Sequence, residues 1–476
     1  MEWNLESFDS SLGNCLFTCQ QQDWISLDSH LDLVVKKSHI SLRSIVLDCP
    51  CLQNIYSLFR LINDHYGDKK DECYYHILCN IFRLLRNCCA GCSANLELIE
   101  GHSDLLFLSG DWLSVNSCHL NLDQSEEKTN KLDAIKCLLQ FYANITAGPE
   151  SEKRPIRKFI FQVLNCKSDP WLIVNPDDSL VKVASAVIYH CLLDNEVLNQ
   201  FISNESHVAS LINGLLLKSF DDLSEWSLFI VELLLGQNIN FKSIIDQSKS
   251  HLNILDVIWK MVTEDNDNRC RIRIKENNIN ILVNLLKEKL LMLSQDEVRN
   301  WTTDEVTFIA RLISIVCEIS CNETYQSPSL DDDNLFRNTI GALKRIHFLH
   351  KAKALRDRES NQNSEQNGGN LATLKKDLVR LVSNLAHNRP NLQLIASQID
   401  AIPLILDLHS FDMNNPFIRE WATYATRNLL FNCNENMEIA RGLKDLNLTT
   451  DSDLMDRLNL NLVDGKLVPK KSPEQE

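Results

Sequence analysis

The chain has 476 residues, 44% of them hydrophobic, and its 64 acidic side chains outnumber 48 basic ones to give a net charge of −16. A surface of that sign repels phosphate backbones, so we expect no nucleic-acid partner. Glycine (13) and proline (11) are scarce, which disfavours large β-proteins and loop-rich enzymes and favours helices joined by short turns.

The first thirty residues resemble neither a secretory leader nor a membrane anchor. Glu2, Glu6 and Asp9 interrupt their apolar pieces, and no run of about 18 uncharged apolar residues occurs in the chain. We therefore expect an intracellular protein without an integral membrane segment, in a reducing compartment. In that reducing compartment its 17 cysteines are expected to be free thiols.

Amphipathic helices are predicted along most of residues 1–355, because apolar residues recur there every three or four positions. Each apolar stripe must be buried against another helix, which indicates stacked, armadillo-like repeats. The stretch 103–131, rich in Asp, Ser and Asn, is predicted as an inserted loop. The clearest helical segments are 74–90, 132–147, 180–193, 225–236, 252–263, 279–293 and 304–319.

A disordered linker is predicted at residues 356–372, where the sequence is polar and Gly368-Gly369 breaks any helix. Residues 373–445 then repeat one pattern, an asparagine that follows an apolar residue by three positions, at Asn384 and Asn428. The interval between these asparagines falls within the armadillo and HEAT period of about 40–47 residues. We therefore expect C-terminal armadillo repeats in this region.

Residues 446–476 are predicted to form a tail with a small hairpin. Residues 458–468 alternate apolar and polar side chains around Asp464-Gly465, a pair typical of tight β-turns. The predicted fold is thus an all-α, armadillo/HEAT-like α-solenoid with a small C-terminal β-hairpin.

Four segments of the C-terminal third carry a more specific pattern: DLVRLVSNL (377–385), IPLIL (402–406), NNPFIREWA (414–422) and YATRNL (424–429). With them the chain resembles the ataxin-10 family, and a generic armadillo repeat does not require the third string. The resemblance implies an armadillo-like solenoid without catalytic residues. It also implies a cytoplasmic protein associated with regulation of cytokinesis and with neuronal survival and neurite growth.

Asparagines in a shared apolar setting are candidate protein-binding residues: Asn87, Asn144, Asn384 and Asn428. On the third helix of an armadillo repeat, such an amide can hydrogen-bond an extended peptide with its donor and acceptor together. The alternative is that each asparagine bridges the backbone of neighbouring repeats. Peptide-binding armadillo proteins add a tryptophan one turn earlier, which only Tyr424 approximates here, so a regular peptide ladder is not expected.

Charged and aromatic neighbours extend this candidate set. Arg83, Arg380 and Arg427 suit an acidic partner, and Trp421 joins them from the family-like segment. The predicted helix 335–355 has a basic end, which fits either an acidic or membrane surface or a solvated helix terminus.

Two Ser-Pro pairs, at Ser327 and Ser472, lie in predicted loops and are phosphorylation candidates. The cysteines at 88, 89 and 92 lack a second pair at zinc-finger spacing, so we expect them to pack in the core and no metal to bind.

Motifs of dinucleotide, phosphate, serine-hydrolase and zinc-protease sites are absent, so no catalytic residue and no cofactor are expected. The sequence therefore predicts a non-catalytic scaffold that binds other proteins. The alternative is an armadillo-type adaptor that holds extended peptides in its concave groove. Self-association stays open.

Overall fold

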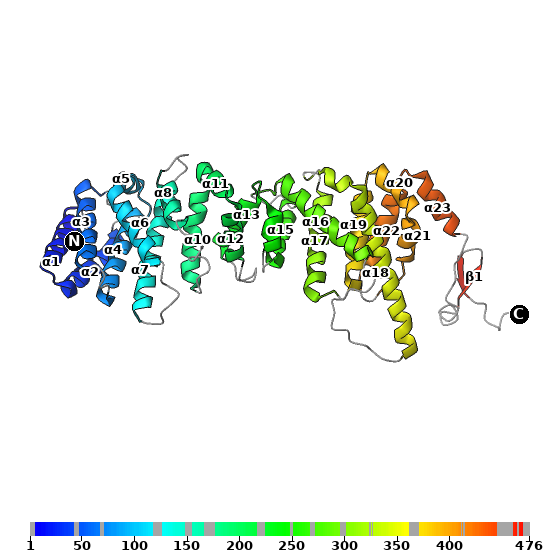
Figure 1. Ribbon diagram of the computed structural model, residues 1–476, viewed down its shortest axis with the longest axis horizontal. Coiled ribbons are helices and arrows are strands. Elements are labelled where there is room, and N and C mark those ends of the chain that lie inside the picture. The colour runs from blue at the N-terminus through cyan, green and yellow to red at the C-terminus, as the bar shows by residue number, and fades with distance from the viewer. Residues whose placement is uncertain are drawn as a thin grey trace. The chain divides into compact units, whose positions relative to one another are not determined.

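The computed structural model is built almost entirely from helices, which Figure 1 labels in chain order. It describes residues 5–41, 47–66, 71–117, 126–147, 155–165, 177–216, 224–247, 251–266, 272–295, 301–322, 325, 327–360, 371–410, 412, 415–444, 460–463 and 466–469.

The chain divides into two compact units. Unit 1 comprises Met1–Met261 and Cys270–Asn278, and unit 2 comprises Val262–Arg269 and Ile279–Glu476. The helices of unit 1 are α1 (Leu5–Gln20), α2 (Trp24–Ser41), α3 (Cys49–Tyr66), α4 (Glu72–Cys89), α5 (Ser93–Gly101), α6 (Ser103–Ser117), α7 (Glu126–Thr146), α8 (Pro155–Asn165), α10 (Asp178–Leu192), α11 (Asn195–Ile202), α12 (Glu205–Leu215), α13 (Glu225–Leu235), α14 (Phe241–Gln247) and most of α15 (His251–Asn266).

Unit 2 holds most of α16 and the family-like segments. Its helices are α16 (Glu276–Gln295), α17 (Thr303–Cys321), η4 (Pro328–Asp331), α18 (Asp333–Ser360), η5 (Leu371–Leu374), α19 (Lys375–Ala386), α20 (Pro390–Gln398), α21 (Ala401–Asp407), α22 (Ile418–Leu430) and α23 (Asn434–Lys444).

Within each unit, equivalent helices pack side by side. In unit 1, α4 lies against α2 and α7, α7 against α10, and α10 against α13; in unit 2, α19 lies between α17 and α22. The apolar stripes anticipated from the sequence form these contacts, because Ile77, Ile81 and Leu85 of α4 are fully buried. Stacking in which each element buries its apolar face on the next is the arrangement of a helical solenoid.

Three of the stacked helices end in the same way. Each C-cap is followed by a residue in the left-handed conformation, which glycine and asparagine adopt most readily and which closes the last carbonyl groups of a helix. The left-handed residues are Gly91 after α4 (φ 77°), Asn388 after α19 (φ 54°) and Asn432 after α22 (φ 57°). This common ending marks α4, α19 and α22 as the same position in their repeats.

The prediction of a loop at 103–131 was wrong at both ends, because α6 spans Ser103–Ser117 and α7 begins at Glu126. Leu105, Trp112 and Leu113 of α6 are buried, and Trp112 Nε1 donates to the Tyr74 hydroxyl at 2.7 Å. Polar side chains in this segment lie between those anchors, so composition alone concealed the helix. In the described part of the chain, no helix is long and apolar enough to cross a membrane.

The ends of the predicted linker 356–372 are helical: α18 continues to Ser360, and η5 begins at Leu371. Charged helix formers at 356–359 let α18 run on, and residues 361–370, with the Gly-Gly pair, lie outside the described residues. Near the C-terminus two short strands pair antiparallel, β1 (Leu460–Val463) and β2 (Lys466–Pro469), with Leu460 opposite Pro469. The turn pair Asp464-Gly465 lies outside the described residues.

Candidate protein-binding surface

The asparagines of unit 2 connect neighbouring repeats. Asn384 Nδ2 on α19 donates to the Cys317 carbonyl of α17 at 3.1 Å. One repeat later, Asn428 Nδ2 on α22 donates to the Ser383 carbonyl of α19 at 3.0 Å. Each donor therefore satisfies a backbone carbonyl of the preceding repeat instead of projecting toward a partner.

Unit 1 uses the same contact. Asn144 Nδ2 on α7 donates to the Arg86 carbonyl of α4 at 2.9 Å. Asn87 is 8% exposed, and its Oδ1 accepts two hydrogen bonds from the Arg86 guanidinium, at 3.0 and 3.2 Å. The candidate residues Arg83, Asn87 and Asn144 therefore lie together on the α4–α7 pair, at a joint between repeats.

A second set of buried amides, which the sequence reasoning missed, closes the helix ends. Asn436 Nδ2 donates to the carbonyls of Leu429 and Gln393, both at 2.8 Å, and Gln393 Nε2 donates to the Asn428 carbonyl at 2.7 Å. In unit 1, Asn95 Nδ2 likewise donates to the Cys88 carbonyl, at 2.8 Å. The signal available in the sequence was an amide residue early in the helix that follows three of the four motif asparagines, Asn87, Asn384 and Asn428.

Aromatic side chains follow α22 from one end to the other, and we call them the aromatic stripe. They are Trp421 and Tyr424 within the helix, Phe417 at its N-cap and Phe431 at its C-cap. Phe417 is 70% exposed, Tyr424 54% and Phe431 52%. The rings of Trp421 and Tyr424 are 5.8 Å apart between centroids, so the middle of the stripe is held in place by its own packing.

Arg380 of α19 braces this stripe from the neighbouring helix. Its guanidinium carbon lies 5.3 Å from the Trp421 ring centroid, and its Nη2 donates to Glu318 Oε1 on α17 at 2.7 Å. Arg380 therefore links three successive stacked helices through one side chain. Arg427, the remaining candidate cation, is exposed on α22 beside Asn428.

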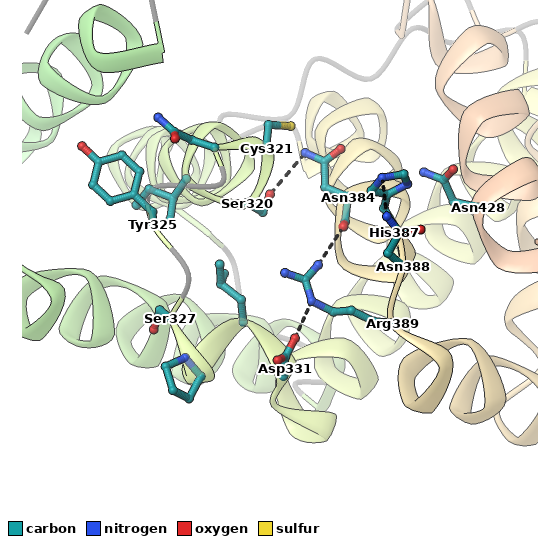
Figure 2. Close-up of a pocket in the computed structure, with 14 residues that line it drawn as sticks. Ser320, Cys321, Tyr325, Ser327, Asp331, Asn384, His387, Asn388, Arg389 and Asn428 are labelled. Carbon is teal, nitrogen blue, oxygen red and sulfur yellow. Dashed lines mark hydrogen bonds and ion pairs between the residues drawn. The ribbon is translucent and has the colours of Figure 1, made fainter. Parts of the chain in front are cut away.

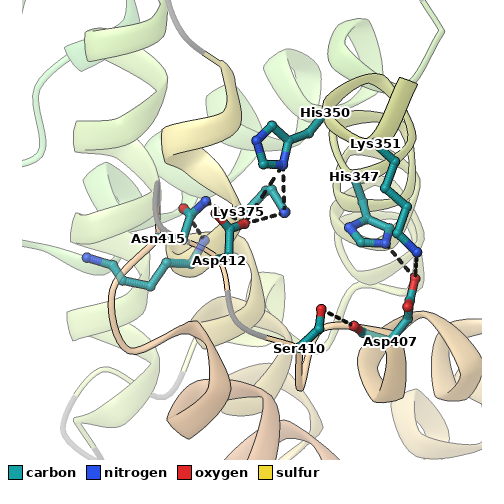
Figure 3. Close-up of polar contacts among 9 residues, drawn as sticks. His347, His350, Lys351, Lys375, Asp407, Ser410, Asp412 and Asn415 are labelled. Carbon is teal, nitrogen blue, oxygen red and sulfur yellow. Dashed lines mark hydrogen bonds and ion pairs between the residues drawn. The ribbon is translucent and has the colours of Figure 1, made fainter. Parts of the chain in front are cut away.

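The residues just before α22 form a buried polar support, shown in Figure 3. Lys375 Nζ and Asp412 Oδ2 are 2.6 Å apart, with the side chains 3% and 9% exposed. Asn415, 2% exposed, donates to Asp412 Oδ2 at 3.1 Å and accepts from the Lys376 backbone N–H at 3.3 Å. This network fixes the chain two residues before Phe417.

Phe417 adopts the left-handed conformation, with φ of 65°. A bulky residue with positive φ is uncommon, costs roughly 1–3 kcal/mol, and clusters at functional sites. The buried support thus holds an exposed aromatic side chain in a strained backbone at the head of the stripe, a costly arrangement for a residue that only covers the core.

A cavity of about 700 Å³ lies near the C-terminal ends of α17, α19 and α22. Its walls carry polar groups, and in Figure 2 the Arg389 guanidinium lies between Asp331 and the Asn384 carbonyl, which it contacts at 3.0 Å. The lining residues include Cys321, Asn384, His387, Arg389 and Asn428. Two of the predicted binding asparagines therefore border this cavity.

Ser327, a predicted phosphorylation site in a loop, is in fact 5% exposed at the N-cap of η4. Its Oγ donates to Asn280 Oδ1 at 2.5 Å and accepts from the Ser329 N–H at 3.2 Å. The Ser-Pro sequence here builds a helix start. Ser472 lies outside the described residues.

The cysteine-rich end of α4 packs in the core: Cys88 and Cys89 are 0% and 2% exposed, and burial raises the pKa of Cys88 to about 12. In the ranges that the structure describes, no group of three or more His, Cys, Asp or Glu side chains is placed to hold a metal ion.

The chain is similar to known proteins over most of its length. The family described as Spinocerebellar ataxia type 10 protein domain matches residues 374–468. Ataxin-10 of Homo sapiens is 24% identical over 446 residues, covering 91% of this chain and 86% of the relative. The ataxin-10 homolog of Dictyostelium discoideum is 32% identical over 106 residues, 21% of this chain and 17% of that protein.

Among solved structures, an engineered protein aligns with a TM-score of 0.32 at 11% identity, covering 94% of this chain and 96% of that one. The domain match spans the segments from which the resemblance was drawn, including the buried support and the aromatic stripe. The chain therefore carries the domain described for spinocerebellar ataxia type 10 protein and is similar to ataxin-10 proteins over about nine tenths of its length.

Proposed function

We propose that this chain is a non-catalytic scaffold that binds other proteins through the aromatic stripe of α22 and the adjoining face of α19. The observation that carries this proposal is that Phe417, Tyr424 and Phe431, at the two caps and in the middle of α22, are each more than half exposed. Contiguous exposed apolar surface marks interaction sites, and Tyr, Trp and Arg dominate the energetics of interfaces.

Rigidity makes this surface suitable for binding. Trp421 is packed between Arg380 and Tyr424, and Phe417 is fixed by the support around Asp412. Side chains that are already ordered lose little conformational entropy when a partner binds, which leaves more of the contact energy as affinity.

The charges beside the stripe favour an acidic partner segment. Arg419 and Arg427 are exposed on α22 against one exposed acidic residue of that helix, Glu420, in a chain whose net charge is −16. A locally basic rim on an acidic protein selects partners by electrostatic complementarity. We therefore propose as occupant a protein segment with an apolar anchor flanked by acidic side chains.

The second candidate is an armadillo-type adaptor for extended peptides in a concave groove. The polar cavity bordered by Asn384 and Asn428 favours it. Against it, the amide nitrogens of both asparagines are already bonded to the preceding repeat, so these side chains offer a peptide only their oxygens.

Similarity to the ataxin-10 family supports the part of the proposal that concerns the cell. On this basis we propose armadillo-type repeats, a cytoplasmic location and roles in regulation of cytokinesis and in neuronal survival and neurite growth. Within this proposal the chain needs no cofactor, and its partners are proteins, with self-association among the outcomes that the experiment below can show. Phosphorylation at Ser327 requires opening of η4, and Ser472, outside the described residues, stays a proposed phosphorylation site.

Crosslinking mass spectrometry on the full chain in cell extract tests the surface. We expect partner crosslinks near α22 that disappear in the variant Phe417→Ala, Tyr424→Ala, Phe431→Ala, and that weaken with added salt. The matched control is Phe107→Ala, because Phe107 is 55% exposed on α6 of unit 1. Partners retained by the triple variant and lost by the control would contradict the proposal, and crosslinks to a second copy would identify self-association.

A further inference from the structure

Two cysteines from successive stacked helices of unit 1 meet in van der Waals contact. Cys79 on α4 and Cys137 on α7 place their sulfur atoms 3.4 Å apart, close enough for one thiol to hydrogen-bond the other. Both are buried, at 4% and 6% exposure. A disulfide requires about 2.05 Å between sulfurs, so the two sulfur atoms must approach each other further before they can bond.

The surroundings of this pair are electropositive. The positive charges of Arg83, one turn after Cys79 on α4, and of Arg86 both act on the Cys137 sulfur. The hydrogen bond from Cys79 and the charge of Arg83 lower the pKa of Cys137 below its usual value, while the same hydrogen bond and burial raise the pKa of Cys79. Cys88, on the same helix as Cys79, shows the opposite effect, because burial raises its pKa to about 12.

The two thiols therefore differ in the way that peroxide chemistry requires. The sulfur that attacks must be a thiolate, and the sulfur that resolves the product must lie within reach of it. Cys137 has the positive charges that stabilise a thiolate, and Cys79 is the adjacent thiol. Arg83 reaches toward the surface, since its side chain is partly exposed, so the pair lies just below solvent.

We propose that Cys79 and Cys137 form an oxidation site for hydrogen peroxide that ends in a disulfide between α4 and α7. The Cys137 thiolate attacks one peroxide oxygen, the O–O bond breaks, hydroxide leaves and Cys137 becomes a sulfenic acid. The Cys79 sulfur then attacks the Cys137 sulfur, its proton and the sulfenic oxygen leave as water, and the S–S bond forms. Two thiols lose two electrons together, and one peroxide becomes two waters.

The disulfide would reinforce an existing joint between repeats. Cys137 lies on the same pair of helices as the hydrogen bond from Asn144 to the Arg86 carbonyl. Crosslinking residues that are far apart in sequence restricts the unfolded chain, so oxidation should raise the thermal midpoint of unit 1 by roughly 5 °C.

Peptide mapping of the full chain after mild peroxide treatment tests the proposal. Digestion without reductant should yield a peptide that links Cys79 to Cys137. In Cys79→Ser the link should be lost and Cys137 should be trapped by dimedone as a sulfenic acid, which a purely structural role would not produce. Arg83→Gln should keep the fold, judged by circular dichroism, and slow formation of the link by at least about threefold.

Two control variants leave the pair intact: Cys191→Ser removes another buried cysteine, and Arg60→Gln removes an exposed arginine of α3. Both should form the link at the wild-type rate. The proposal is overturned if both thiols remain unmodified while other cysteines oxidise, if either pairs with a different cysteine, or if Arg83→Gln oxidises as fast as wild type.

Discussion

The α4–α7 pair of unit 1 and the α19–α22 pair of unit 2 are joined by the same hydrogen bond, from Asn144 to the Arg86 carbonyl and from Asn428 to the Ser383 carbonyl. An arginine one turn before the earlier asparagine reaches the next helix in both pairs. The charge of Arg83 acts on Cys137, and Arg380 lies over Trp421.

Counted from the bridging asparagine, Cys137 and Trp421 occupy the same position, yet the neighbouring positions differ. The exposed Phe417, Tyr424 and Phe431 in and beside α22 correspond to Asp133, Gln140 and Ala147 in and beside α7. The scaffold contacts are therefore shared, and the surface that surrounds them decides what each pair of helices can do. Unit 2 presents an aromatic surface, and unit 1 presents a reactive thiol beside a cation.

Removing the buried polar support beneath the aromatic stripe should cause the largest loss in the free energy of unfolding. Lys375→Met leaves the buried carboxylate of Asp412 without its ammonium partner, and breaking such a pair costs about 3–5 kcal/mol. Urea unfolding should show this loss, whereas Lys36→Ala, at a surface pair on α2, should cost less than about 1 kcal/mol. Equal losses in the two variants would mean that the network does not support unit 2.

Acidification should lower the stability of the two units to different extents, because their buried histidines have different surroundings. Burial and the charge of Arg157 lower the pKa of His190 in unit 1 to about 4 from 6.5, whereas His347 in unit 2 is bonded to the Asp407 carboxylate at 2.7 Å, which opposes the effect of burial on its pKa. Between pH 6.5 and about 4 the unfolded chain binds a proton at His190 that the folded chain does not. Stability should therefore fall as the pH drops through that window.

With allowance for partial exposure of the ring, the loss from His190 should be about 2 kcal/mol. Urea unfolding at pH 7 and pH 4.5 checks it: His190→Gln should lose less stability on acidification than wild type, and His347→Gln should differ from wild type by less. If His190→Gln and wild type have the same pH dependence, the histidine does not contribute.

Loss of the shared hydrogen bond should lower the free energy of unfolding by the same amount in both units. Asn144→Ala and Asn428→Ala each remove the donor to a backbone carbonyl, which should lower the free energy of unfolding by about 1–2 kcal/mol. Denaturant titration of the two variants measures this loss. The comparison variant is Asn54→Ala, because the Asn54 amide donates to the part-buried Asp9 and so does not join the same helices. A cost in only one unit would show that the joints are not equivalent.

Local pattern was enough to predict the helices and the recurring asparagines, because burial of an apolar face repeats every three or four residues. The left-handed backbone and the exposure of Phe417 were not predictable in this way, and neither was the nearby ion pair between Lys375 and Asp412, which only the tertiary fold brings together. The Cys79–Cys137 contact and the burial of Ser327 have the same origin. The surface chemistry of this solenoid lies in contacts between repeats, which no single repeat encodes.

The smallest expected effect concerns the stripe itself. Phe431 is 52% exposed, so Phe431→Ala should change the free energy of unfolding by less than about 0.5 kcal/mol, although it removes a large side chain. Phe59 of α3, which is fully buried, provides the contrast, because Phe59→Ala should cost about 3–5 kcal/mol. A phenylalanine that adds little to stability is free to serve an interface, and a loss above about 2 kcal/mol at Phe431 would instead assign this residue to the core.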